Sequence, residues 1–161
     1  MREVRLNAED AKITQRCRGK SEVRKKNMTQ FEVSQSLNQL SHQVIGCAIE
    51  VHRTLGPGLL ESIYEAALCQ EFDQAGLEYA QQYSFVGEYK AKQLPPQRID
   101  LLIENQLILE LKAVTTVNDL HLAQLVSYLR LANKPLGLLI NFHAPTIQKG
   151  THRRINSKAI T

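Results

Sequence analysis

Apolar residues recur three or four positions apart in three stretches of this chain, and this spacing predicts amphipathic helices. The first helix is predicted over about residues 36–54 and the second over about 59–75. A third is predicted over about 119–132, where Asn118 or Asp119 can cap its first turn. The second and third helices flank the middle of the chain, where the helical spacing of apolar residues is absent.

Shorter stretches of branched and apolar residues predict strands. Three are expected in succession, around Gln82–Tyr89, at Arg98–Ile103 and at Leu107–Lys112. A fourth, Leu136–Phe142, is apolar throughout, which is typical of a strand buried on both faces. The order helix, helix, three strands, helix, strand predicts an α/β domain with a mixed four-stranded sheet flanked by helices.

Two acids and a lysine interrupt the central pair of predicted strands. Asp100 lies in the first strand, and Glu110 and Lys112 lie in the second. Ionised groups in a buried strand need an opposite charge or a metal ion. Two carboxylates near a lysine suit a hard cation such as Mg²⁺, which takes a few carboxylate oxygens and keeps several waters. Such a site is suited to phosphodiester hydrolysis.

The register of this hairpin decides whether the two acids meet. A loop of Glu104-Asn105-Gln106 places Asp100 opposite Glu110 and Arg98 opposite Lys112, so that like charges face each other. A shift by two residues would instead pair Arg98 with Glu110 in an exposed charged ladder, and a two-residue loop would put the acids on opposite faces. The spacing alone leaves the metal site and the charged ladder both open.

The chain has 161 residues, of which 43% are hydrophobic and 22% charged, as expected for one globular domain with a real core. Its net charge of +4 is uneven, because residues 1–30 carry nine Lys/Arg against four Asp/Glu. A basic leader can attract phosphate, although we expect residues 1–34 to be a solvated, disordered tail. The domain is expected at 35–156, with a C-terminal tail at 157–161. Met28 is an alternative to Met1 as the natural start.

Several classes of protein are excluded by what the sequence contains. Cys17, Cys47 and Cys69 lie far apart without metal-ligand spacing, which argues against a zinc site or a disulfide framework and favours a reduced, cytoplasmic setting. The sequence has no apolar stretch long enough for a membrane span and no secretory signal. Gly56-Pro57-Gly58 joins two helices and is therefore no dinucleotide fingerprint.

This order of elements, with these residues at these places, resembles the PD-(D/E)xK nuclease superfamily and, within it, the GxxExxY family. The resemblance covers roughly residues 36–156 and implies a restriction-endonuclease-like αβββαβ core. Glu-x-Lys alone would be common by chance, but the combination is specific. The matching segments are Gly58-Leu59-Leu60-Glu61-Ser62-Ile63-Tyr64 with its surroundings from Ala48, then Asp100, Glu110-Leu111-Lys112 and Ile140-Asn141-Phe142.

The resemblance also implies a set of site residues. Asp100, Glu110 and the backbone carbonyl of Leu111 would bind Mg²⁺ or Mn²⁺, and Lys112 would position or activate the attacking water. Glu61 would point toward this cluster, as a ligand or through water. The alternative for Glu61 is a carboxylate placed only to favour the helix dipole.

Gln124 and Tyr128 resemble the Q-x-x-x-Y element of RecB-type exonucleases and would share one helical face. Gln124 would hold a backbone phosphate or the active-site lysine. Tyr128 would touch nucleic acid or pack in the core, as amphipathic aromatics usually do. Gly58 and Tyr64 are the other expected substrate contacts. RecB-type exonucleases often use a histidine ligand where this chain has Glu61; His52 and His121 are expected at helix ends instead.

The function predicted from the sequence is a metal-dependent nuclease that cleaves DNA by direct attack of water. The alternative is a module with weak or absent catalysis that binds nucleic acid or a protein on the same fold. The expected partner is nucleic acid, DNA in the first place, with no membrane, and formation of a homo-oligomer is left open. The sequence does not distinguish DNA from RNA or cleavage at ends from internal cleavage.

Overall fold

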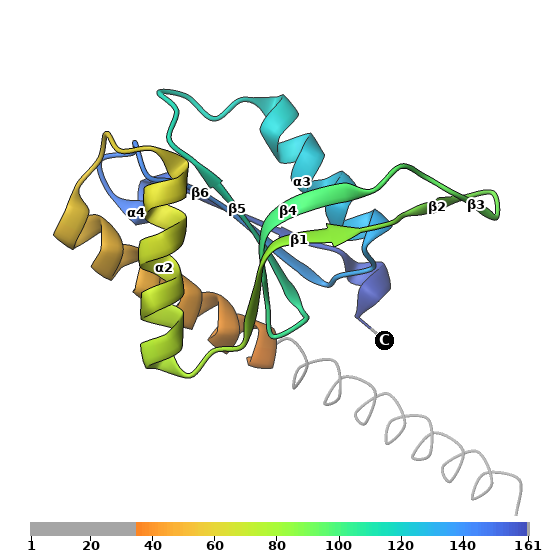
Figure 1. The fold of residues 1–161 in the computed structure, drawn as a ribbon, viewed down its shortest axis with the longest axis horizontal. Helices are drawn as coiled ribbons and strands as arrows, with labels where there is room; N and C mark the ends of the chain where they lie inside the picture. The colour runs from red at the N-terminus through yellow and green to blue at the C-terminus, as the bar shows by residue number, and fades with distance from the viewer. Residues whose placement is uncertain (1–34, 161) are drawn as a thin grey trace, which may run out of the picture. The chain divides into compact units, whose positions relative to one another are not determined.

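The computed structural model describes residues 35–160, so the leader expected over 1–34 lies outside the described part. Residues 37–160 lie in one compact unit. A first helix covers residues 35–55. After it come α2 (Glu61–Ala75), β1 (Tyr79–Phe85), β2 (Glu88–Tyr89), β3 (Lys92–Gln93), β4 (Gln97–Ile103), β5 (Leu107–Lys112), α3 (Asp119–Leu131), β6 (Leu136–Asn141), α4 (Ile147–Gly150), β7 (Thr151–Ile155) and a 3-10 helix at Ser157–Ala159 (Figure 1).

The main sheet has five strands in the order β1-β4-β5-β6-β7. The β5–β6 pair is parallel and the other pairs are antiparallel, so the sheet is mixed, as the sequence predicts. The prediction of four strands was wrong by one. β7 falls on a segment that the sequence shows only as a basic cluster around Arg153 and Arg154. Charged residues are common on edge strands such as this one, and they hide the apolar pattern of a strand.

Helices cover both faces of this sheet. Figure 1 shows the first helix and α2 on one side and α3 on the other. On the α3 side, Leu125 and Leu129 are buried against the sheet. A Cβ atom added to Gly137 of β6 would lie 2.8 Å from the side chain of Leu125, so glycine is needed for this close approach of helix and strand. The α/β class with helices on both faces is therefore confirmed.

The β4–β5 hairpin has the register that the metal site requires. Leu101 pairs with Leu109, and Ile103 pairs with Leu107. The three-residue loop begins with Glu104 and Asn105 in the left-handed region, at φ 50° and 52°. Continuing this pairing by one residue puts Asp100 opposite Glu110.

Candidate active site

The pairing of β1 with β4 is interrupted at Asp100. Gln82 of β1 and Asp100 of β4 lie opposite each other but are not paired, and the pairs before and after this gap keep the same register. Gln82 has a left-handed backbone at φ 46°. Such a local irregularity bends a strand and redirects its side chains. The pairs that flank the gap are Gln81↔Leu101 and Tyr83↔Ile99.

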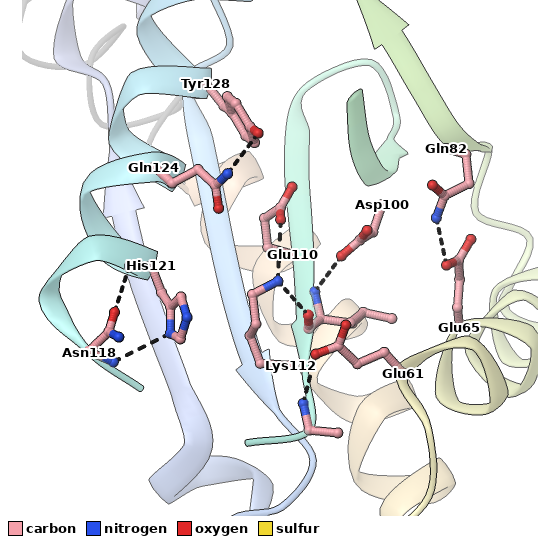
Figure 2. Close-up of polar contacts among 12 residues, drawn as sticks. Glu61, Glu65, Gln82, Asp100, Glu110, Lys112, Asn118, His121, Gln124 and Tyr128 are labelled. Carbon is pink, nitrogen blue, oxygen red and sulfur yellow. Dashed lines mark hydrogen bonds and ion pairs between the residues drawn. The ribbon is translucent and has the colours of Figure 1, made fainter. Parts of the chain in front are cut away.

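The gap changes which face each residue of β4 occupies. Ile99 and Leu102 both pack in the core beneath α3, although residues three apart in a regular strand point to opposite faces. The strand therefore turns at Asp100, and its carboxylate is directed along the sheet toward β5. There Oδ2 of Asp100 accepts a hydrogen bond of 2.8 Å from the backbone N–H of Leu111 (Figure 2).

Glu110 is the most unusual group of the site. Its side chain is buried, the residue being only 6% exposed, and its Oε1 atom is buried without a hydrogen-bond partner. The pKa of Glu110 is raised to about 7, first by burial and then by the charge of Asp100, and Lys112 opposes this shift. A buried carboxylate with a free oxygen is costly unless something compensates its charge.

Lys112 is the positive charge closest to this acid. Its Nζ lies 3.7 Å from Oε2 of Glu110 and donates a hydrogen bond of 2.9 Å to the carbonyl oxygen of Leu111. Figure 2 shows Asp100, Glu110 and Lys112 around the end of β5, with the carboxylates of Asp100 and Glu110 to either side of that strand. The predicted metal ligands and the predicted catalytic lysine are therefore brought together.

Glu61 comes from α2 and contacts the backbone directly after β5. It is the first residue of α2, where a carboxylate is favoured by the helix dipole. Its Oε1 accepts a hydrogen bond of 3.0 Å from the backbone N–H of Ala113, directly after Lys112. Its charge also contributes to the raised pKa of Glu110. Glu61 thus fixes the start of α2 to the end of β5 at the edge of the acidic cluster.

Gln124 and Tyr128 lie on α3 across from Glu110 (Figure 2). Nε2 of Gln124 donates a hydrogen bond of 2.9 Å to the hydroxyl of Tyr128, and the ring of Tyr128 packs edge-on against Phe85. Burial raises the pKa of Tyr128, and the charge of Glu110 adds to this shift. The amide of Gln124 bonds Tyr128 here and not Lys112, which differs from the expectation that Gln124 holds the lysine.

Tyr64 of the GxxExxY segment is not placed to contact a substrate, although the sequence predicted such a contact. Tyr64 is fully buried, and its ring stacks on Phe142 with centroids 4.2 Å apart. Its hydroxyl donates to the carbonyl of Gly56 at 2.7 Å and accepts from the N–H of Leu59 at 3.1 Å. A substrate cannot reach this ring, so Tyr64 supports the loop from below. Gly58 is exposed in that loop and has φ 106°, which by itself favours glycine.

The two histidines weighed as ligands lie elsewhere. His121 closes the capping box of α3, where its Nδ1 accepts from the N–H of Asn118 at 3.4 Å. Nε2 of His52 lies 3.1 Å from the carbonyl oxygen of Ala144. Each therefore has a structural role at the end of a helix.

No three His, Cys, Asp or Glu side chains within residues 35–160 are grouped as a complete metal site. A Mg²⁺ ion does not require one, because it is usually held by one or two carboxylates and keeps its waters. The unpartnered oxygen of Glu110, the carboxylate of Asp100 and the carbonyl of Leu111 are all hard oxygen donors. The residues present fit a hydrated divalent cation, whose charge would compensate the buried acid.

Two further residues near the site, Asn141 and Glu65, are not among the predicted site residues. Asn141 is buried at the end of β6, and its side chain bonds both the N–H and the carbonyl of Val114, so it fixes the segment after Lys112. Glu65 accepts from Nε2 of Gln82 at 2.8 Å, and burial together with the charge of Asp100 raises its pKa. The only signal for Glu65 was its position one helical turn after Glu61.

The raised pKa of Glu110 predicts a pH dependence of stability in the metal-free protein. In the folded state this pKa is about 7, above the ordinary value of 4.5. Its contribution to the unfolding free energy is therefore fully present below pH 4.5 and is lost as the pH rises through 7. We expect a loss of roughly 3 kcal/mol in this window, measured by urea unfolding in EDTA. Glu110→Gln should remove this loss, and identical pH profiles for the two proteins would contradict it.

Continuing the β4–β5 register by one residue places Asp100 opposite Glu110 of the Glu-x-Lys segment, and this arrangement in a mixed sheet is typical of a PD-(D/E)xK domain. A sequence profile described as the PD-(D/E)XK nuclease superfamily matches residues 38–155, and the chain belongs to this superfamily. No curated protein and no solved structure matches the chain. The match does not extend to the GxxExxY family, so that assignment stays a prediction.

None of the helices in the described part of the chain is long and apolar enough to cross a membrane.

Proposed function

We propose that this protein is a Mg²⁺- or Mn²⁺-dependent nuclease that hydrolyses phosphodiester bonds in DNA. Membership of the superfamily supports nuclease chemistry and a nucleic-acid substrate. The observation that carries the proposal is the buried carboxylate of Glu110, which has an unpartnered oxygen and lies beside Lys112. Such a group is unfavourable for folding, and a cation at this position gives it a function.

Each residue of the cluster has a defined part in this proposal. When bound, a divalent cation supplies a water of lowered pKa and neutralises charge on the phosphate. Asp100, Glu110 and the carbonyl of Leu111 would hold it. Lys112 would orient the attacking water or stabilise the anionic transition state with its ammonium group. Glu61 keeps the start of α2 against the end of β5, so that the acids and the lysine stay in place.

A binding module without catalysis is the second candidate, and the charge of the domain favours it. Residues 35–160 contain eleven Lys/Arg and eleven Asp/Glu, so they carry no net charge. Proteins that grip duplex DNA usually present a basic stripe. The two candidates differ in cleavage, because a binding module leaves the phosphodiester bonds intact whatever metal is present.

The test is incubation of the purified protein with linear duplex, closed circular and single-stranded DNA, in Mg²⁺, Mn²⁺ or EDTA. We expect cleavage that requires metal and falls by about 10²–10⁴-fold in Lys112→Ala, because the ammonium group at the reacting phosphate is lost. Lys158→Ala removes an exposed lysine outside the cluster and should cleave like the wild type. Cleavage of equal rate in Lys112→Ala, or in EDTA, would overturn the proposal.

We also propose a reducing, cytoplasmic setting. The two cysteines within residues 35–160, Cys47 and Cys69, are both free thiols. Free thiols persist where glutathione and thioredoxin keep cysteines reduced.

A further inference from the structure

The β2–β3 hairpin projects beyond the β1–β4 pair, away from the body of the domain (Figure 1). Glu88 pairs with Gln93, and Tyr89 pairs with Lys92, so the connection is the two-residue turn Lys90-Ala91. Opposed residues of an antiparallel pair share a face. Tyr89 and Lys92 therefore lie on one face of the hairpin, and Glu88 lies on the other.

The tip of this hairpin presents an aromatic ring with two ammonium groups. Tyr89 is 61% exposed. This exposure is unusual, because aromatic rings normally bury most of their surface in a core or an interface. Nζ of Lys90 lies over the ring at 5.3 Å from its centroid, and Lys92 shares the face of Tyr89. The one acid of the hairpin, Glu88, points away from this face, so the face is locally basic on a domain without net charge.

The turn is held in a conformation that its residues disfavour. Lys90 and Ala91 have φ 49° and 59°, as a type I′ turn requires, yet neither is Gly, Asn or Asp. Left-handed backbone is unfavourable for such residues. Lys90 is exposed, and its ammonium group lies over the neighbouring tyrosine ring. A sequence optimised for folding alone would place Asn-Gly here.

The base of the hairpin packs against the C-terminal end of α3. The backbone of Gly87 lies against Leu131 of α3, so closely that an added Cβ would be 3.0 Å from its side chain. Leu131 lines a groove of about 440 Å³ together with Gln124, Ser127 and Tyr128. This volume is within the range of sites for ligands the size of a nucleotide, about 300–1,000 Å³. The groove thus extends from the Gln124–Tyr128 pair, which faces Glu110, to the foot of the hairpin.

We propose that the β2–β3 hairpin binds unpaired bases of a single-stranded segment and guides that strand along the α3 groove to the active site. Tyr89 would stack on a base, and Lys90 and Lys92 would contact the adjacent phosphates. Stacking on an exposed aromatic ring with flanking cations is how proteins hold single strands without reading their sequence. A duplex offers no unstacked base to Tyr89, and the neutral domain lacks the many phosphate contacts that duplex binding needs. This inference rests on the proposed nuclease function and names its substrate class.

The test measures binding of fluorescein-labelled DNA to the full-length protein in EDTA, by anisotropy, so that no cleavage occurs. The probes are a 12-nucleotide single strand and the duplex of the same sequence. We expect tighter binding of the single strand, a loss of about tenfold in Tyr89→Ala and a change below about twofold in Tyr89→Phe, which keeps the ring. Lys92→Ala should weaken binding and reduce its salt dependence, whereas Lys158→Ala should not.

The control for folding is the circular dichroism spectrum of each variant, which should be unchanged because the substituted side chains are exposed. Every variant keeps the same basic N-terminal segment, so its contribution to binding cancels in the comparison. Tighter binding of the duplex, or equal single-strand affinity in Tyr89→Ala and the wild type, would overturn the inference. Neither result affects metal-dependent cleavage that is lost in Lys112→Ala, so failure of the inference and failure of the proposed function are distinguishable.

Discussion

Glu110→Gln is expected to lower the rate of DNA cleavage by about 10²–10⁴-fold while making the metal-free protein more stable at pH 8. The amide keeps the shape of the side chain but cannot carry the negative charge that a hard cation requires. The same substitution removes a buried carboxylate whose Oε1 has no partner and whose pKa is raised to about 7. Activity and stability should therefore change in opposite directions, measured by initial cleavage rates and by urea unfolding.

The matched control for this result is Glu78→Gln. Glu78 is an exposed acid directly before β1, at the end of the sheet where Tyr79 pairs with Ile103 and away from the acidic cluster. Its substitution should leave both the cleavage rate and the unfolding free energy within experimental error. A Glu110→Gln protein that cleaves like the wild type would show that this carboxylate is not part of the reaction. A Glu110→Gln protein that is active but less stable would assign Glu110 to the structure alone.

Tyr64→Ala has the largest expected effect on stability, a loss of about 3–5 kcal/mol. The ring is fully buried and stacks on Phe142, and its hydroxyl bonds two backbone groups of the loop that carries Gly58. Truncation leaves a cavity beneath this loop and an unsatisfied carbonyl at Gly56. Tyr64→Phe keeps the packing and loses only the hydrogen bonds, so about 1–3 kcal/mol is expected. Urea unfolding at fixed pH measures both.

Tyr89→Ala supplies the control for Tyr64, since the same substitution is made at a ring that is 61% exposed. We expect a change within about 0.5 kcal/mol there. Tyr64→Phe should also lower cleavage modestly, because the loop leads directly into Glu61 at the start of α2. Equal stability of Tyr64→Ala and the wild type would remove the structural role assigned to this tyrosine.

The sequence indicates that Asp100 and Glu110 lie on neighbouring strands, but it leaves open whether the two acids meet. Apolar residues on either side of Asp100 and Glu110 indicate two neighbouring strands, and an odd loop is required for the acids to meet. The structure has that loop, with Glu104 and Asn105 in the left-handed region. Asn is a residue that tolerates this conformation, whereas Glu gives no signal for it, so the choice between registers was not decided by the sequence.

The gap at Asp100 was not predictable, because it depends on a strand distant in the chain. Gln82 of β1 and Asp100 of β4 are both skipped by the pairing, and only their meeting in the sheet turns the carboxylate toward Leu111. Local propensity contains no information on this contact. For the same reason the sequence did not indicate that Gln82 also bonds Glu65 and so connects α2 to the gap.

Other differences follow from the environment of single side chains. The sequence gives Tyr64 and Tyr128 the same amphipathic character, but Tyr64 is fully buried against Phe142 whereas Tyr128 borders the groove. Gln124 bonds Tyr128 one turn away, whereas Lys112 bonds the carbonyl of Leu111. The burial of each tyrosine depends on packing between elements that are distant in the sequence. The pattern of residues within one segment gives no information on that packing.

Isothermal calorimetry with Mn²⁺ measures whether Glu110 and Asp100 hold a divalent cation, on which the proposed nuclease activity depends. We expect saturable Mn²⁺ binding to the wild type, at least tenfold weaker binding to Glu110→Gln, and binding retained in Lys112→Ala, whose ammonium group is no ligand. Wild-type protein that takes up no Mn²⁺, or a Glu110→Gln protein with unchanged affinity, would contradict the proposed metal site.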